Sequence, residues 1–197
     1  MDGAVKDLQA EKKALRSKII AARRNLTDNY RQRASNRMLT VFCALPDFKE
    51  PRKVLCYASM ADEVQIRPLM EKWLSLGVTV ALPHITGKGQ MEAVSFTDID
   101  SLVEGEYGIL TPDLEKGEII PPDELDLIIV PGIAYDTRGE RLGMGGGFYD
   151  AYLARATKAK RIALAFSCQL VAKIPMEAHD VLVHKIITEQ GIYNCLL

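Results

Sequence analysis

The sequence predicts an α/β protein with a three-layer, Rossmann-like fold, a mostly parallel sheet and an N-terminal helical pair. Strand patterns recur along the chain at 53–58, 78–82, 91–96, 126–130, 161–166 and 181–188. Between the first two, a helix pattern begins at Pro68 and ends at Gly77, and strand, helix, strand is the βαβ unit of a parallel sheet. A chain of 197 residues is long enough for one full core, so we expect residues 1–197 to form one domain.

Two amphipathic segments predict the helical pair. Residues 7–25 form the first helix, because apolar residues recur at helical spacing in Leu8, Leu15, Ile19 and Ala22. Thr27 or Asp28 would cap a second helix that runs to about Ala44, and the following Pro46 ends it. The rest of the first helix is basic: Lys12, Lys13, Arg16, Lys18, Arg23 and Arg24. Taken alone, such a face is interpreted as solvated surface.

Composition excludes several classes of function. Hydrophobic residues make up 48% and charged residues 26%, and the formal net charge of −1 gives no bias toward nucleic acid or a membrane surface. No apolar run approaches membrane-spanning length, and the charged N-terminus is unlike a secretory signal. The cysteines are scattered without a Cys-x-x-Cys pair, which favours reduced thiols: Cys43, Cys56, Cys168 and Cys195. We expect a cytoplasmic monomer that binds neither nucleic acid nor a membrane, with an organellar form not excluded.

A glycine-rich stretch is the strongest functional signal. Four glycines fall within five residues, namely Gly143, Gly145, Gly146 and Gly147. A strand pattern precedes them and helix formers follow, so their backbone N–H groups would line a concavity at a helix N-terminus that suits phosphate. Arg141 adds a cation beside this turn, and Asp150 falls in the first helical turn, where it could hold a divalent metal.

The spacing of these glycines excludes two common motifs. No lysine follows them as a P-loop requires, and Gly143-x-Gly145-x-Gly147 lacks the spacing of a dinucleotide fingerprint. The plainer alternative is a turn needed only for tight strand-to-helix packing. The flanking Arg141 and the pair Tyr149 and Asp150 favour phosphate chemistry instead.

Two further polar residues are interpreted as supporting the site. Asp136 lies in the polar turn 135–139, where it is expected to fix the loop by accepting hydrogen bonds from backbone N–H groups. His84, at the end of the second strand pattern, is expected to be a hydrogen-bonded neighbour of the site.

The run from Asp126 to Asp150, including Arg141-Leu-Gly-x-Gly-Gly-Gly-Phe-Tyr-Asp150, resembles the 5-formyltetrahydrofolate cyclo-ligase family, also called 5,10-methenyltetrahydrofolate synthetases. Weaker matches extend the resemblance from about Lys12 to Ile192. Family members convert 5-formyltetrahydrofolate to 5,10-methenyltetrahydrofolate with Mg-ATP. The resemblance therefore implies a reduced folate and ATP as substrates and Mg²⁺ as cofactor.

The resemblance also implies roles for individual residues. It assigns catalysis to Arg141 and Asp150, and Mg²⁺ to Asp150 and Asp180, because His179-Asp180 resembles the pair before the family's last strand. Nucleotide contacts are implied for Lys12, Lys13, Arg16, Arg141, Leu142, Gly143, Met144, Gly145, Gly146, Gly147, Phe148 and Tyr149. A polar pair that members carry near the nucleotide corresponds to the segment that contains Gln169.

Folate contacts are implied on two further segments. Glu63 follows the first strand, and a carboxylate can accept the paired N–H donors of a pterin ring. Tyr107 would stack on a flat ring, although packing on the core surface explains it equally well. The glycine turn would complete the folate site with Met144, Gly145, Gly146, Gly147 and Phe148. Met144 and His184 depart from the family pattern.

Two other functions fit parts of the pattern. A nucleotide-binding or sugar-phosphate-binding module without this chemistry explains the glycine turn and the βαβ unit, but not Glu63 together with the run 141–150. A purely structural Rossmann-like subunit explains only the fold.

Overall fold

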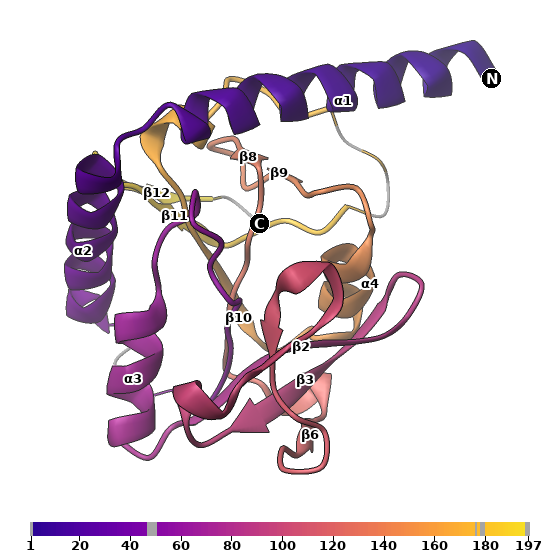
Figure 1. Cartoon of the computed structure of the whole chain (residues 1–197). Coiled ribbons are helices and arrows are strands. Elements are labelled where there is room, and N and C mark those ends of the chain that lie inside the picture. Colours follow the sequence, from indigo (N-terminus) through magenta and orange to yellow (C-terminus); the bar gives the residue numbers. More distant parts are fainter. Residues whose placement is uncertain (1, 47–50, 176, 178–179, 196–197) are drawn as a thin grey trace.

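The computed structural model describes residues 2–46, 51–175, 177 and 180–195, and its centre is a large sheet (Figure 1). Within the described residues this sheet has eight strands. In spatial order they are β12 (Ile192–Asn194), β11 (Lys185–Ile187), β10 (Lys160–Leu164), β7 (Leu127–Ile129), β1 (Lys53–Leu55), β2 (Thr79–Gly87), β3 (Gln90–Phe96) and β6 (Ile119–Ile120).

The five strands from β11 to β2 pair in parallel, which confirms the mostly parallel sheet predicted from the sequence. Val54 in β1 pairs with Val80 on one side and with Leu127 on the other. The edge strands β12 and β6, and β3 beside β6, run antiparallel to their neighbours. α3 (Arg67–Ser75) connects β1 to β2 and completes the expected βαβ unit.

Helices cover both faces of the sheet, which makes three layers (Figure 1). α2 (Asp28–Ala44) and α3 pack on one face, where the Phe42 and Trp73 rings meet edge to face at 5.7 Å. α4 (Phe148–Arg155) packs on the other face. Successive residues of a strand point to opposite faces, so Val54 joins the first core cluster and Leu55 the second.

α1 (Asp2–Arg24) lies across one end of the sheet rather than on a face (Figure 1). Its buried Ile19 packs against a small antiparallel hairpin formed by β8 (Ala134–Tyr135) and β9 (Arg141–Leu142). The turn to α2 forms as predicted, because the Thr27 side chain accepts a hydrogen bond from the Tyr30 N–H. The helical pair is confirmed, and only its second member packs on the main sheet.

Tertiary pairing moves the ends of several predicted strands. β2 continues past Pro83 to Gly87, because β3 pairs with it and the Pro83 carbonyl accepts a hydrogen bond from Thr111 Oγ1 at 2.9 Å. The predicted final strand shortens to β11, since the Val183 N–H bonds the Gly139 carbonyl instead of a ladder partner. β12 then adds an antiparallel edge.

Short elements complete the connections. A second hairpin joins β4 (Val103–Glu104) and β5 (Leu110–Thr111) beside β2. Single turns of 3₁₀ helix span Ile99–Ser101, Glu106–Gly108, Pro122–Glu124 and Ser167–Gln169. None of the helices in the described part of the chain combines the length and the apolar character needed to span a lipid bilayer.

Candidate functional site

The order of the strands reverses between β1 and β7, and we call the region outside the carboxyl ends of these two strands the crevice. From β1 the chain runs outward through β2, β3 and β6, then returns to β7 on the other side of β1 and continues outward to β10 and β11. Open α/β sheets bind ligands at such a reversal, outside the carboxyl ends of the strands. The segment after β1 contains Glu63, and the segment after β7 contains the glycine turn, so sequence-predicted residues from both halves of the chain meet here.

The glycine turn, residues 143–147, joins β9 to α4. Gly145 has φ +104° and Gly147 has φ +71°, values that favour glycine, and Gly147 is the N-cap of α4. No side chain caps this helix, and residues 144–147 are exposed to solvent. The helix N-terminus is therefore open to an anion, as the sequence predicts.

Arg141 and Asp150, the two residues implied in catalysis, are in contact. The Arg141 Nη2 lies 2.6 Å from Asp150 Oδ1, and the arginine side chain is only 2% exposed. The absence of a side chain at Gly143 makes room for this guanidinium, since a Cβ there would lie 2.8 Å from Nη1. The Arg141 Nε is buried without a hydrogen-bond partner. A buried donor of this kind is costly, which favours a ligand on it.

α1 brings Arg16 to the glycine turn. The Arg16 Nε donates to the Gly143 carbonyl at 2.8 Å, and its guanidinium lies 3.6 Å from the position a Cβ on Gly145 would take. Lys13, which follows the buried Lys12 in the sequence, is exposed. The structure thus joins the predicted phosphate-binding cations of the first helix to the glycine turn through Arg16.

Lys12 forms ion pairs with two carboxylates instead. Its Nζ lies 2.7 Å from Glu177 Oε2 and 2.9 Å from Asp180 Oδ2, and its side chain is 6% exposed. Burial acts against the charged amine, but the hydrogen bonds that the amine donates to both carboxylates outweigh it and raise the pKa of Lys12. The interpretation of the basic face as solvated surface is therefore wrong for Lys12.

The two acids implied in metal binding are held in separate ion pairs. Asp150 pairs with Arg141, whereas Asp180 pairs with Lys12 and also accepts the Glu177 N–H at 2.8 Å. In the described ranges, histidines, cysteines and acids form no group of three that could hold a metal ion. His179 lies outside the described residues. The protein alone offers no preformed metal cluster in the part that the structure describes.

Glu63 is buried in the segment that follows β1. Its side chain is 13% exposed, with Oε2 accepting the Met60 N–H at 3.0 Å and Oε1 lying 3.5 Å from Arg23 Nη1. Burial raises the pKa of this carboxyl group. Gln65 holds the backbone of the same turn, donating to the carbonyls of Met60 and Glu63.

Three tyrosines with buried hydroxyl groups lie close enough to Glu63 for its charge to raise their pKa values further, after burial as the main cause. Two of them have partners: the Tyr57 hydroxyl donates to the Val64 carbonyl and the Tyr135 hydroxyl to the Val130 carbonyl. The third, Tyr149, has a buried hydroxyl without a partner. The sequence analysis missed Tyr57 and Tyr135, because only the fold brings the ends of β1 and β7 together.

The remaining predicted residues divide between exposed and structural positions. Tyr107 is 78% exposed on the β4–β5 hairpin with φ +60°, and Met144 is 65% exposed on the glycine turn. Both side chains are available to a ligand rather than part of the core. Gln169 is buried and bonds backbone groups of Phe166 and Gly132, so it braces the loop after β7.

Asp136 has the predicted loop-fixing role. Its carboxylate is fully buried and accepts hydrogen bonds from the N–H groups of Arg138, Glu140 and Ile174. His84 lies within the extended β2, and its Nδ1 is 3.3 Å from Thr111 Oγ1. His184 precedes β11 and accepts the Arg161 N–H at 2.9 Å, which places it at the amino ends of the strands, away from the crevice.

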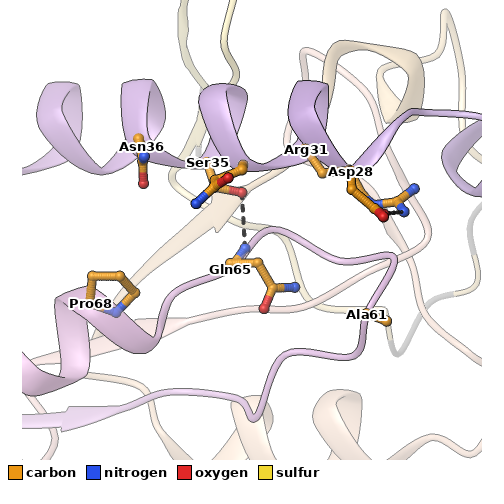
Figure 2. Close-up of a pocket in the computed structure, with 8 residues that line it drawn as sticks. Asp28, Arg31, Ser35, Asn36, Ala61, Gln65 and Pro68 are labelled. Carbon is orange, nitrogen blue, oxygen red and sulfur yellow. Dashed lines mark hydrogen bonds and ion pairs between the residues drawn. The ribbon is translucent and has the colours of Figure 1, made fainter.

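A polar pocket of about 310 Å³ lies between α2 and the segment before α3 (Figure 2). Its lining residues are Asp28, Arg31, Gln32, Ser35, Asn36, Ala61, Gln65 and Pro68. The Gln65 N–H donates to Ser35 Oγ at 3.0 Å, and Arg31 forms an ion pair with Asp28. None of the sequence-predicted site residues lines this pocket.

The fold and the site together describe an α/β protein in which buried cations, carboxylates and a glycine turn gather at the switch point of an open sheet. Residues 8–189 match the model of the 5-formyltetrahydrofolate cyclo-ligase family, and the chain belongs to that family. It is 31% identical over 176 residues to the 5-formyltetrahydrofolate cyclo-ligase of Escherichia coli, covering 87% of this chain and 97% of the relative. The mouse enzyme of that name is 28% identical over 196 residues, covering 93% and 96%.

A solved structure extends the comparison. The NMR structure of Aquifex aeolicus 5,10-methenyltetrahydrofolate synthetase superposes with a TM-score of 0.83 at 33% identity, covering 93% of this chain and 92% of that one. The same fold is therefore present over nearly the whole length of both chains.

Proposed function

We propose that this protein converts 5-formyltetrahydrofolate to 5,10-methenyltetrahydrofolate in an ATP-dependent and Mg²⁺-dependent reaction. The observation that carries the proposal is the meeting of two half-sites at one crevice. Arg16, Arg141 and the glycine turn supply phosphate-binding groups, and Glu63 with the unpartnered Tyr149 hydroxyl supplies polar groups for a flat, hydrogen-bonding ring. The names of the bacterial and mouse relatives support the same reaction.

The ATP half would use the cations of α1 and the N-terminus of α4. Phosphate oxygens are strong acceptors, and the open N–H groups after Gly147 and the guanidinium groups of Arg16 and Arg141 are matched donors. Lys13 is exposed on the same helix and would reach the outer phosphates. The turn residues Leu142, Gly143, Met144, Gly145, Gly146 and Phe148 and the backbone of Tyr149 would complete the ATP contacts, which leaves the Tyr149 hydroxyl for the folate.

The folate half would use the segment after β1 and the exposed side chains around it. The Glu63 carboxylate would accept two N–H donors of the pterin, and burial makes such a bond stronger than in water. Tyr107 and Met144 would pack on the flat ring, since both side chains are largely exposed. Glycine-turn residues from Gly145 to Phe148 would border the folate and ATP halves alike.

Mg²⁺ fits the charges of the site although the described residues form no metal cluster. In phosphate-transfer sites Mg²⁺ is commonly held by one or two carboxylates, with substrate phosphates and water as the other ligands. Asp150 and Asp180 would be those carboxylates once ATP phosphates replace them as partners of Arg141 and Lys12. When bound, Mg²⁺ supplies neutralisation of the phosphate charge.

The proposed reaction activates the formyl oxygen as a leaving group. The γ-phosphoryl group of ATP moves to that oxygen, which releases ADP. N10 then attacks the formyl carbon, the carbon–oxygen bond breaks, and the oxygen leaves in phosphate, which also takes up the N10 proton. The protein's part is to position the reactants and stabilise charge, with Arg141 beside the transferred group.

The decisive experiment mixes purified protein with 5-formyltetrahydrofolate, Mg²⁺ and ATP and follows the absorbance of the methenyl product. ATP-dependent product formation is expected, and omission of Mg²⁺ should abolish it. Folded protein that binds ATP but forms no product would contradict the proposal and favour a nucleotide-binding module. In a thermal-shift assay, such a module would respond to Mg-ATP alone, whereas the enzyme should respond further to the reduced folate.

Three further properties stay predictions of the same proposal. Residues 1–197 should unfold as one cooperative unit, sediment as a monomer and act in the cytoplasm. A plant relative of 26% identity is named as mitochondrial, so imaging of tagged protein should include mitochondria.

A further inference from the structure

The inward face of α1 carries a cation toward each half of the crevice. Lys12, Arg16, Ile19 and Arg23 are spaced by four, three and four positions, so they share one face of the helix. Arg16 contacts the glycine turn, Ile19 packs in the middle, and Arg23 lies about 10 Å further along the helix axis than Arg16, at about 1.5 Å per residue. Nothing in the family resemblance assigns a role to Arg23.

Arg23 is buried against the segment that holds Glu63. Its side chain is 3% exposed, with Nε and Nη2 lying 3.0 Å and 2.9 Å from Asp62 Oδ2. Its Nη1 lies 3.5 Å from Glu63 Oε1. One planar guanidinium thus bridges two neighbouring carboxylates, a geometry that a lysine amine does not reproduce.

We propose that Arg23 is a positioning residue, which fixes the Glu63 carboxylate toward the folate from the same helix that serves the ATP phosphates. This inference deepens the proposed function and rests on it. Without Arg23, Asp62 and Glu63 would place two adjacent negative charges in a buried segment, and Glu63 would turn away or take up a proton. Either change removes the acceptor that the pterin requires.

The charges around Glu63 define what a pH measurement reports. The groups that face it are Arg23 from α1, Asp62 from its own turn, and the tyrosines 57, 135 and 149 from the ends of β1, β8 and α4. Burial and Asp62 raise the pKa of Glu63, whereas Arg23 lowers it. Loss of Arg23 should therefore make Glu63 protonate at a higher pH than in the wild type.

The backbone of the turn has its own supports. The Met60 N–H and the Gln65 side chain bond within the segment, and Ser59 Oγ donates to the Val64 carbonyl at 2.9 Å. An Arg23→Gln variant should therefore keep the backbone of this turn. It should lose only the positive charge and the forked geometry with which the guanidinium bridges Asp62 and Glu63. Arg24→Gln is the matched control, because Arg24 is the next residue on the same helix, is 73% exposed and lies 3.9 Å from Asp62.

The test is equilibrium binding of 5-formyltetrahydrofolate and of ATP, followed separately and as a function of pH. For Arg23→Gln we expect a folate Kd raised about tenfold or more, an ATP Kd within about twofold of the wild type, and a folate-binding midpoint moved to higher pH. Arg23→Lys should restore part of the loss. Arg24→Gln should bind folate as the wild type does. In a Glu63→Gln background, the added effect of Arg23→Gln should disappear.

Several outcomes would overturn the inference. Wild-type folate affinity in folded Arg23→Gln, an equal loss of ATP and folate binding, or an unchanged pH midpoint would each assign Arg23 to structure alone. If Arg23→Gln does not fold, Arg23→Lys carries the same comparison, and wild-type folate binding by it would count against a fork-dependent role. Wild-type protein that binds no folate would refute the proposed function itself, which keeps the two failures distinguishable.

Discussion

Arg141 and Asp150 are nine positions apart and form an ion pair of 2.6 Å between a buried guanidinium and a carboxylate at the start of α4. The pair uses Nη2 of the arginine and leaves its buried Nε without a partner. The predicted phosphate-binding cation and the predicted metal-binding acid therefore hold each other in place. A phosphate would compete with Asp150 for Arg141 and leave the acid available to a metal ion.

The first prediction concerns the acid of this pair. Asp150→Asn should lower kcat/KM by about 100-fold, the order of effect seen when one preorganised charged or polar group is removed from an active site. Asp100→Asn is the control, because Asp100 forms a 2.8 Å pair with Arg67 at the surface and is 80% exposed. Steady-state kinetics over a range of Mg²⁺ concentrations measure the effect, and near-wild-type turnover would exclude Asp150 as a metal ligand.

The second prediction separates two tyrosines of α4 that both bury a hydroxyl without a partner. Tyr149 lies beside Arg141, whose guanidinium is 6.0 Å from the centre of its ring, whereas Tyr152 is fully buried in the core cluster on the α4 side of the sheet. Replacing either with phenylalanine should leave stability unchanged or higher, since no hydrogen bond is lost. Only Tyr149→Phe should raise the Kd for folate, by roughly tenfold, which is the value of one hydrogen bond. Equal Kd values for the two variants would remove Tyr149 from the folate site.

The third prediction tests the backbone at the N-cap of α4. Gly147 has φ +71° with no atom within 4 Å of a Cβ placed on it, so alanine there changes the backbone preference alone. Gly147→Ala should cost about 1–2 kcal/mol of unfolding free energy and lower Tm by roughly 2–8 °C. Gly191→Ala, where a Cβ also meets open space, should change Tm little. ATP titration should show weaker binding only for Gly147→Ala, and equal Tm values for the two variants would contradict the prediction.

The fourth prediction concerns the loop that supports the crevice. Burial opposes the charge on Asp136, but hydrogen bonds from Arg138 and from backbone N–H groups outweigh it and lower the pKa of its carboxyl group. Asp136→Asn should therefore reduce the unfolding free energy at neutral pH by about 2–3 kcal/mol. Asp98→Asn, which alters an exposed cap of a 3₁₀ turn, is the control and should cost less.

The pH dependence of this effect follows from the direction of the shift. Because the folded pKa of Asp136 lies below its unfolded value, the carboxylate stabilises the fold above the unfolded pKa. That stabilisation is lost as the pH falls through the folded pKa. Denaturant titrations should show that the difference in unfolding free energy between wild type and Asp136→Asn becomes smaller in acid. A difference that stays constant with pH would contradict the assignment.

Patterns of local sequence predicted much of what the structure contains. The glycine spacing of residues 143–147 predicts an open helix N-terminus, and the structure places left-handed glycines and α4 there. Thr27 predicts a cap and forms one, and Asp136 predicts an Asx-type turn and accepts the bonds. These features depend on backbone preferences and on hydrogen bonds between neighbours, which a local pattern records.

Features that depend on distant partners were missed or misplaced. The β8–β9 hairpin and β12 are too short to carry a strand pattern, and they exist because α1 and β11 pack or pair with them. Pro83 predicts the end of a strand that in fact continues, since pairing with β3 outweighs the missing N–H.

The sequence by itself determined the fold class, the family and the residues that bear charge. Only the tertiary structure decided which charges meet: Lys12 with Asp180, Arg141 with Asp150, and Arg23 with Glu63. The physical reason is that the free energy of a charged group depends on its burial and on its partner across space. A sequence shows that Arg23 and Arg24 are equally basic, whereas the fold buries the first at 3% exposure and leaves the second at 73%.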